Sequence, residues 1–108
     1  MTPSEISTML QSISQTIPVY YDHADVGAKV PFIEWRLMSD SNFSADNKTF
    51  CEVYSVTVDF YTKNKDLTSE GLIKSVLKNN DVPFSQDETY LDDERLYIET
   101  FTFSIIDQ

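Results

Sequence analysis

The sequence predicts an α+β fold, an antiparallel sheet with two helices packed on one side and the element order α-β-β-β-α-β-β. Two segments place apolar residues at helical spacing, and several others alternate apolar and polar residues with period two. Strands that follow one another in the chain favour antiparallel pairing. The 108 residues hold no internal repeat and no interdomain linker, which predicts a single domain over residues 1–108.

The first segment has the features of a helix start. Thr2 suits the N-cap, Pro3 suits the first helical position, and Glu5 completes a capping box. Pro18 then ends the helical pattern. The apolar stripe of this helix consists of Ile6, Met9, Leu10 and Ile13.

Three strands are expected next. Residues 19–21 form a short strand, residues 22–29 a loop, and residues 31–38 a strand with one apolar face made of Ile33, Trp35 and Leu37. The longest alternation runs from about 48 to 62 and predicts the third strand. Its apolar face carries Phe50, Tyr54, Val56, Val58 and Phe60.

A second helix follows the turn at 63–66, and a hairpin closes the chain. Thr68 is the expected N-cap of the helix, residues 79–81 end it, and Gly71 is interpreted as a tight packing point. The hairpin has arms at about 83–91 and 95–106. Apolar side chains expected to face the core are Leu72, Ile73, Val76 and Leu77 from the helix and Tyr97, Phe101, Phe103 and Ile105 from the second arm.

The charge balance argues against sequence-specific DNA binding. The chain has 8 basic and 18 acidic residues, a net charge of −10. A phosphate-binding surface needs clustered Lys and Arg, which are lacking. A single Cys excludes an intrachain disulfide, and no apolar run reaches the ~20 residues of a membrane helix. We therefore expect synthesis in the cytoplasm and no contact with a membrane.

No residue pattern predicts catalysis, a metal site or a cofactor. His23 is the only histidine and lies in a loop, without spacing to a nucleophile. Cys51 lacks a nearby cation to activate it and is interpreted as a structural thiol. An acidic cluster lacks calcium-loop spacing and is interpreted as a solvated hairpin tip; its members are Asp87, Glu88, Asp92, Asp93 and Glu94.

Interaction is the remaining function class. Phe43 stands in a polar loop, Tyr61 on a polar strand face, and Tyr97 beside acidic residues. Aromatic side chains in polar settings are candidate contacts with a partner, although each alone is equally consistent with packing inside the domain. A small acidic domain without a catalytic pattern favours an assembly part over an enzyme.

Several segments of the chain share a pattern with a known family. They are the run Val30-Pro31-Phe32-Ile33-Glu34-Trp35, the loop with Asn42-Phe43-Ser44-Ala45-Asp46-Asn47, the strand end Val58-Asp59-Phe60-Tyr61-Thr62-Lys63, Lys65-Asp66, the Glu94-bearing hairpin and the strand from Tyr97 to Ile106. In these segments the chain resembles the tail terminator (tail-completion) proteins of long-tailed bacteriophages from Gram-positive hosts. The resemblance covers nearly the whole chain and includes the order of elements.

This resemblance implies a structural virion protein at the tail-neck junction. It implies a ring, hexameric in the family, that sits on the last ring of tail tube protein and stops tube polymerisation. Its other face joins the head-side connector, and DNA passes through the bore in transit. In such a ring we expect Phe43, Tyr61 and Tyr97 at a ring or tube interface, and the acidic cluster facing the bore or a neighbour, where carboxylates repel phosphate.

Three alternatives stay open at the level of sequence. A head-completion protein of the neck, a stopper or adaptor, shares the size and ring symmetry. An acidic DNA-mimic inhibitor of a host enzyme fits the net charge, although the acids gather at one end of the chain. A small enzyme is the third, and the absence of a triad, a metal set or a phosphate loop counts against it.

Overall fold

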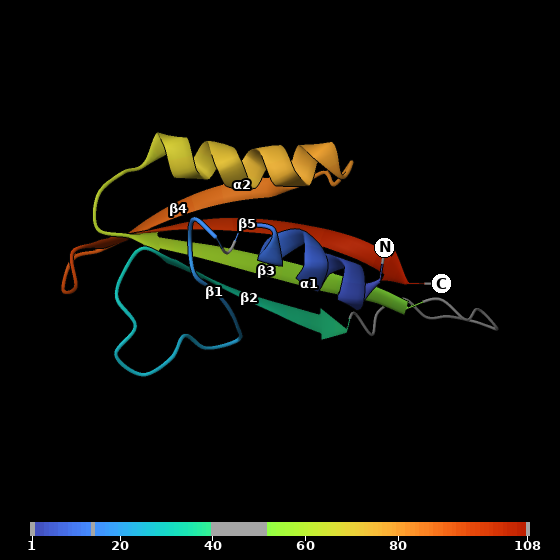
Figure 1. Ribbon diagram of the computed structural model, residues 1–108, viewed down its shortest axis with the longest axis horizontal. Coiled ribbons are helices and arrows are strands. Elements are labelled where there is room, and N and C mark those ends of the chain that lie inside the picture. The colour runs from blue at the N-terminus through green and yellow to red at the C-terminus, as the bar shows by residue number, and fades with distance from the viewer. Residues whose placement is uncertain (1, 14, 40–51, 108) are drawn as a thin grey trace.

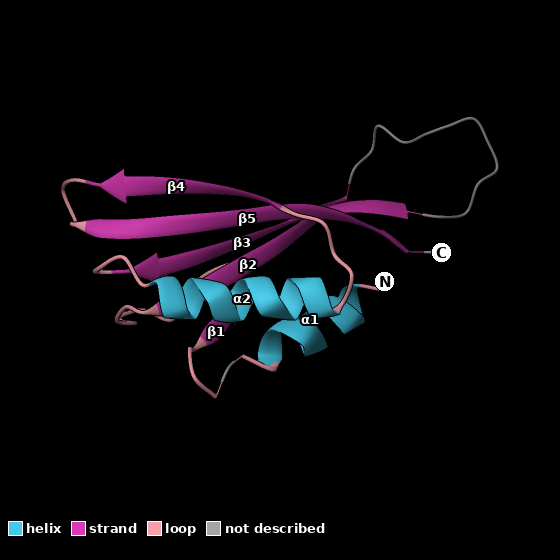
Figure 2. Ribbon diagram, turned by 90° about the horizontal axis from the view of Figure 1, so that it is seen from above, coloured by secondary structure: helices cyan, strands magenta, loops and turns pink. Residues whose placement is uncertain are grey.

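The computed structural model describes residues 2–13, 15–39 and 52–107 and has the predicted α+β class and element order. Its elements are α1 (Pro3–Gln11), β1 (Val19–Tyr21), β2 (Phe32–Ser39), β3 (Glu52–Thr62), α2 (Leu67–Asn79), β4 (Ser85–Leu91) and β5 (Leu96–Asp107). Both helices cover the same face of one five-stranded sheet (Figures 1 and 2). The molecule is elongated, 47 × 28 × 24 Å along its principal axes.

The sheet is mixed rather than wholly antiparallel. Its strand order is β1-β2-β3-β5-β4, and β1 pairs with β2 in parallel. The expected antiparallel pairing was therefore wrong for β1 and β2. The chain between Tyr21 and Phe32 returns to the end of the sheet where β1 begins, so β2 runs in the same direction as β1. Two backbone hydrogen bonds extend the parallel ladder, from Ile33 N to Pro18 O (2.9 Å) and from Asp22 N to Trp35 O (2.7 Å).

The second half of the chain places its last strand inside the sheet. Helix α2 carries the chain from β3 to the edge strand β4, and the β4–β5 hairpin then inserts β5 between β4 and β3 (Figure 1). Since β3 and β4 both pair antiparallel with β5, they run parallel to each other. Helix α2 therefore crosses over β5, and its buried side lies against β5.

The helix starts differ in how well they were predicted. The capping box of α1 is confirmed, with Thr2 Oγ1 accepting from Glu5 N (3.1 Å) and Glu5 Oε1 accepting from Thr2 N (2.7 Å). The N-cap of α2 is Asp66, not Thr68. The Asp66 carboxylate reaches both the backbone N (3.1 Å) and the hydroxyl (2.8 Å) of Ser69, which satisfies a free amide of the first turn.

Gly71 is not a tight packing point, contrary to the expectation. A Cβ added there would meet nothing within 4 Å, so the glycine leaves the α2 backbone accessible. Ile13 lies beyond the end of α1 but is still buried, as its place in the apolar stripe predicted.

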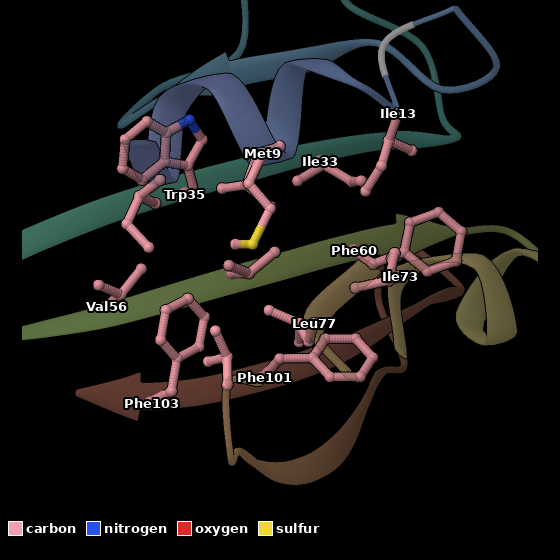
Figure 3. Packing of buried hydrophobic residues seen from close by; sticks show 14 of the residues in the cluster. Met9, Ile13, Ile33, Trp35, Val56, Phe60, Ile73, Leu77, Phe101 and Phe103 are labelled. Carbon is pink, nitrogen blue, oxygen red and sulfur yellow. The ribbon is translucent and has the colours of Figure 1, made fainter. Parts of the chain in front are cut away.

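The core fills the layer between the helices and the sheet (Figure 3). The alternation predicted in the strands is confirmed, because apolar positions that share a row in the strand register are buried or, as at Leu37 and Tyr54, partly buried against the core. Examples are Ile33 beside Phe60, and Val56 between Leu37 and Phe103. The fully or almost fully buried apolar residues are Ile6, Met9, Leu10, Ile13, Ile17, Ile33, Trp35, Val56, Val58, Phe60, Ile73, Leu77, Val82, Phe101, Phe103 and Ile105.

Candidate interaction surface

The sheet has a second face that no described helix or strand covers (Figure 2). The strand register defines which side chains share this face, because neighbours in register point to the same side. One row crosses all five strands and carries three carboxylates. In order from β1 to β4 it consists of Tyr20, Glu34, Asp59, Thr100 and Asp87.

An apolar row lies beside the acidic one. It contains Phe32, Tyr61 and Ile98, which are neighbours in register on β2, β3 and β5. The rings of Phe32 and Tyr61 are stacked, with centroids 4.8 Å apart, and Tyr20 meets Phe32 edge-on at 6.0 Å. All these side chains are half-buried, so the uncovered face offers apolar area next to charge.

The acids of the uncovered face are held in defined positions. Glu34 Oε2 accepts a hydrogen bond from Ala24 N at 2.8 Å, and Asp59 Oδ1 accepts one from Thr100 Oγ1 at 2.7 Å. Burial, and then the carboxylate of Glu34, raise the pKa of Tyr61 to about 12. The phenol also donates a hydrogen bond to the Glu34 carboxylate, which contributes to the same rise.

The structure separates the aromatic residues proposed as contacts. Tyr61 lies on the uncovered face, whereas Tyr97 is the register partner of Thr62 and lies on the helix-facing side. There Tyr97 packs against Tyr90, with ring centroids 4.8 Å apart. Phe43 lies outside the described residues, as does Cys51.

The predicted acidic cluster also divides into three parts. Asp87 is exposed on the uncovered face, and Glu88, its neighbour along β4, points to the helix-facing side. Asp92, Asp93 and Glu94 are exposed in the turn between β4 and β5, at the end of the molecule where α2 begins (Figure 1). Only the last three form the solvated hairpin tip that the sequence suggested.

A polar cluster at the start of α2 was missed by the sequence reading. Lys65 Nζ lies 3.1 Å from Glu99 Oε2 and 3.4 Å from Glu70 Oε2, and it also contacts Glu88 Oε1. Gln86 Nε2 donates to Glu99 Oε1 at 2.9 Å and to Glu70 Oε1 at 3.4 Å. The cluster joins α2, β4 and β5.

Burial makes this cluster electrostatically unusual. The side chains of Glu70 and Glu99 are only 3% and 2% exposed, and one ammonium faces three carboxyl groups. Burial and then the hydrogen bond with Glu88 raise the pKa of Glu99. The hydrogen bond from Glu99, followed by Lys65, lowers the pKa of Glu88. Hydrogen bonds to Glu88 and then Glu99 raise the pKa of Lys65.

The described residues show no arrangement for catalysis by His or by a metal. His23 is exposed, and its Nε2 lies 3.1 Å from the carboxylate of its chain neighbour Asp22. No set of three or more His, Cys, Asp or Glu among the described residues is placed to hold a metal ion. The chemistry that this surface supports is docking, through aromatic, hydroxyl and carboxylate groups.

Comparison with protein-family models finds no match, and comparison with curated proteins finds none either. Within the described part of the chain, neither helix has the length and apolarity needed to cross a membrane.

Proposed function

We propose that this chain is a structural virion protein, the tail terminator of a long-tailed phage. In this role a ring of copies, hexameric as the family resemblance implies, caps the tail tube, stops its polymerisation and joins the tail to the head-side connector. Its partners are other copies of itself, the tail tube protein and the connector protein, with DNA only in transit through the bore.

The observation that carries the proposal is the uncovered sheet face. A small two-layer domain has buried one face of its sheet under helices and left the other with an aromatic row and an acidic row in register. A cyclic ring needs two different complementary surfaces on each copy, and such a face supplies one of them. The exposed acids at the hairpin tip suit a conduit through which DNA passes without binding.

The DNA-mimic alternative is less well supported by this geometry. A mimic presents carboxylates along one continuous face, as phosphates follow a strand. The uncovered face does carry three carboxylates in one row, but Glu34 and Asp59 there already accept hydrogen bonds from Ala24 N and Thr100 Oγ1. Glu88 points to the opposite face of the sheet, where it is engaged by Lys65.

The proposal is tested by electron microscopy of lysates from a phage that lacks this gene. Headless tails of abnormal length are expected, because tube growth loses its stop. Supplying the gene from a plasmid should restore tails of normal length. Headless tails of normal length beside separate heads would assign the protein to the neck, and complete infectious particles would remove it from the virion.

A further inference from the structure

One flank of α2 is basic, unlike most of the chain. Its solvent side carries Lys74 and Lys78 and no acid, because the only acidic residue of the helix, Glu70, is buried and held by Lys65. Among the described residues neither lysine has an ion-pair partner. The two ammonium groups are therefore available to an outside partner.

The position of this flank follows from helical spacing. Residues four apart follow one another along a helix face, so Lys74 and Lys78 continue the line that begins at Glu70. The Glu70 carboxylate reaches Gln86 of β4, which places the line on the β4 side of the helix, away from α1. Gly71 on the same flank leaves the backbone open, and Leu67 is 70% exposed.

We propose that this basic α2 flank of one copy docks on the uncovered sheet face of a second copy, with Lys74 and Lys78 against Glu34 and Asp59. The proposal deepens the ring assigned above and rests on it, because it names the two surfaces that meet between neighbouring copies. Covering the open face with a helix completes a helix–sheet–helix sandwich, a common way for a two-sided sheet to be buried.

The spacing of the charges fits this contact. Side chains one helical turn apart have Cβ atoms about 5–6 Å apart. Neighbouring strands lie about 4.7–4.9 Å apart, and Glu34 and Asp59 are register partners on β2 and β3. A helix that crosses the strands can therefore set one lysine over each carboxylate. Tyr20, next in the row, then offers its ring to the Gly71–Leu67 part of the flank.

A second copy is the occupant that the charges favour. On the strands of the uncovered face three carboxylates, Glu34, Asp59 and Asp87, outnumber the one described cation, Arg36. Two such faces brought together would oppose their acidic rows, so a symmetric pair through this face is disfavoured. The basic α2 flank of the same chain supplies the opposite charge. It lies on the helix-covered face of the sheet, towards β4. Contacts between two different surfaces are heterologous, and they close into a ring when the rotation between copies allows it.

The test uses paired charge reversal in the purified full chain. Proton–nitrogen correlation spectra and sedimentation are recorded at rising concentration for wild type, for Lys74→Glu with Lys78→Glu, and for Glu34→Lys with Asp59→Lys. In wild type, concentration-dependent shifts are expected on α2 and on the uncovered face of β2 and β3. Each double variant should lose self-affinity by about tenfold or more. An equimolar mixture of the two variants should associate again, since each reversed surface now meets its complement.

Controls separate this result from misfolding and from net charge. Glu34→Gln with Asp59→Asn keeps hydrogen-bond acceptors while removing charge, and it should also weaken association with an unchanged fold. Lys29→Glu with Lys63→Glu matches the charge change of the lysine pair outside the flank and should leave association as in wild type.

The proposal is overturned by a wild-type chain without concentration-dependent shifts, by shifts confined to other surfaces, or by a mixture that fails to associate. Failure of the terminator role is seen separately, since the deletion phage would then make either headless tails of normal length or complete particles. A phage carrying Lys74→Glu with Lys78→Glu that still makes tails of normal length would reject this contact while leaving the terminator role intact.

Discussion

Lys65 Nζ lies 3.1 Å from Glu99 Oε2, a contact across 34 positions of the chain that joins the turn before α2 to the first half of β5. Glu99 stands in the core-facing row of β5, next to Phe60 of β3. A carboxyl at such a position is costly to bury unless it is hydrogen-bonded or paired. Lys65, Gln86 and Glu88 together make its burial tolerable, so the cluster is a condition for docking α2 on the sheet.

Replacing Lys65 should therefore destabilise the fold. Lys65→Met leaves Glu70, Glu88 and Glu99 without their shared cation, and the free energy of unfolding from urea titration should fall at neutral pH. The loss should shrink in acid, where protonated carboxyls need no counter-charge. Lys63→Met, which removes an exposed lysine two residues earlier, is the control. Equal losses in the two variants would show that the cluster has no stabilising role.

The raised pKa of Glu99 predicts a pH dependence with a definite sign. Folding favours the protonated form, so this group's contribution is full below its usual pKa and is lost as pH rises through the raised value. Glu99→Gln, which cannot ionise, should gain stability relative to wild type over that interval, by about 1.4 kcal/mol for each unit by which the pKa is raised. Urea titrations of both proteins across this pH range measure the difference. A constant difference would contradict the assignment.

Local sequence patterns predicted most of the fold, but they did not predict the long-range polar contacts. Alternation placed Trp35, Val58 and Phe101 on the buried face, and it also implied that position 99 faces the core. An acid there signals a partnered carboxyl, but nothing local identifies Lys65 as the partner. The parallel β1–β2 pair was missed for a similar reason, because the path of a long loop is set by tertiary contacts and not by its composition.

The candidate surface was predicted only in part. Tyr61 was recognised on a polar strand face, but its stacking on Phe32 depends on the register between β2 and β3. A shift of one residue in register would move either side chain to the other face, and a single sequence does not define that register. The acidic row had the same difficulty, since Glu34, Asp59 and Asp87 are far apart in the chain.

The centre of the core makes a direct test of the fold. Phe101 is fully buried, and its ring meets Phe84 edge-on with centroids 5.7 Å apart. Phe101→Ala should cost about 3–5 kcal/mol of unfolding free energy, because lost transfer energy and a residual cavity add. Val26→Ala, at a fully exposed side chain, should stay within about 0.5 kcal/mol of wild type. A loss at Phe101 no larger than that at Val26 would be incompatible with this packing.

The N-cap of α2 can be assigned by comparing two substitutions. Asp66→Ala removes the acceptor for Ser69 N and should cost about 0.5–2 kcal/mol. Thr68→Ala, at the cap expected from sequence, should change stability far less. Hydrogen bonds from Ser69 also lower the pKa of Asp66, so the cost of Asp66→Ala should diminish as pH falls through that lowered value. A larger effect at Thr68 would return the cap to the position first predicted.

The acids at the hairpin tip provide the test of a bore-facing role. Glu88 is unsuitable for charge reversal, since it pairs with Lys65 and its loss would disturb the fold. Asp92, Asp93 and Glu94 are exposed in the turn, and their replacement by Lys leaves the core untouched. If they line the path of DNA, added positive charge should retain phosphate and slow ejection from purified particles, with Asn and Gln replacements intermediate. Ejection can be followed by the fluorescence of a dye that binds released DNA. Unchanged kinetics in particles with normal tails would place the tip away from the bore, and loss of tail length control would instead place it at a neighbour or at the tube.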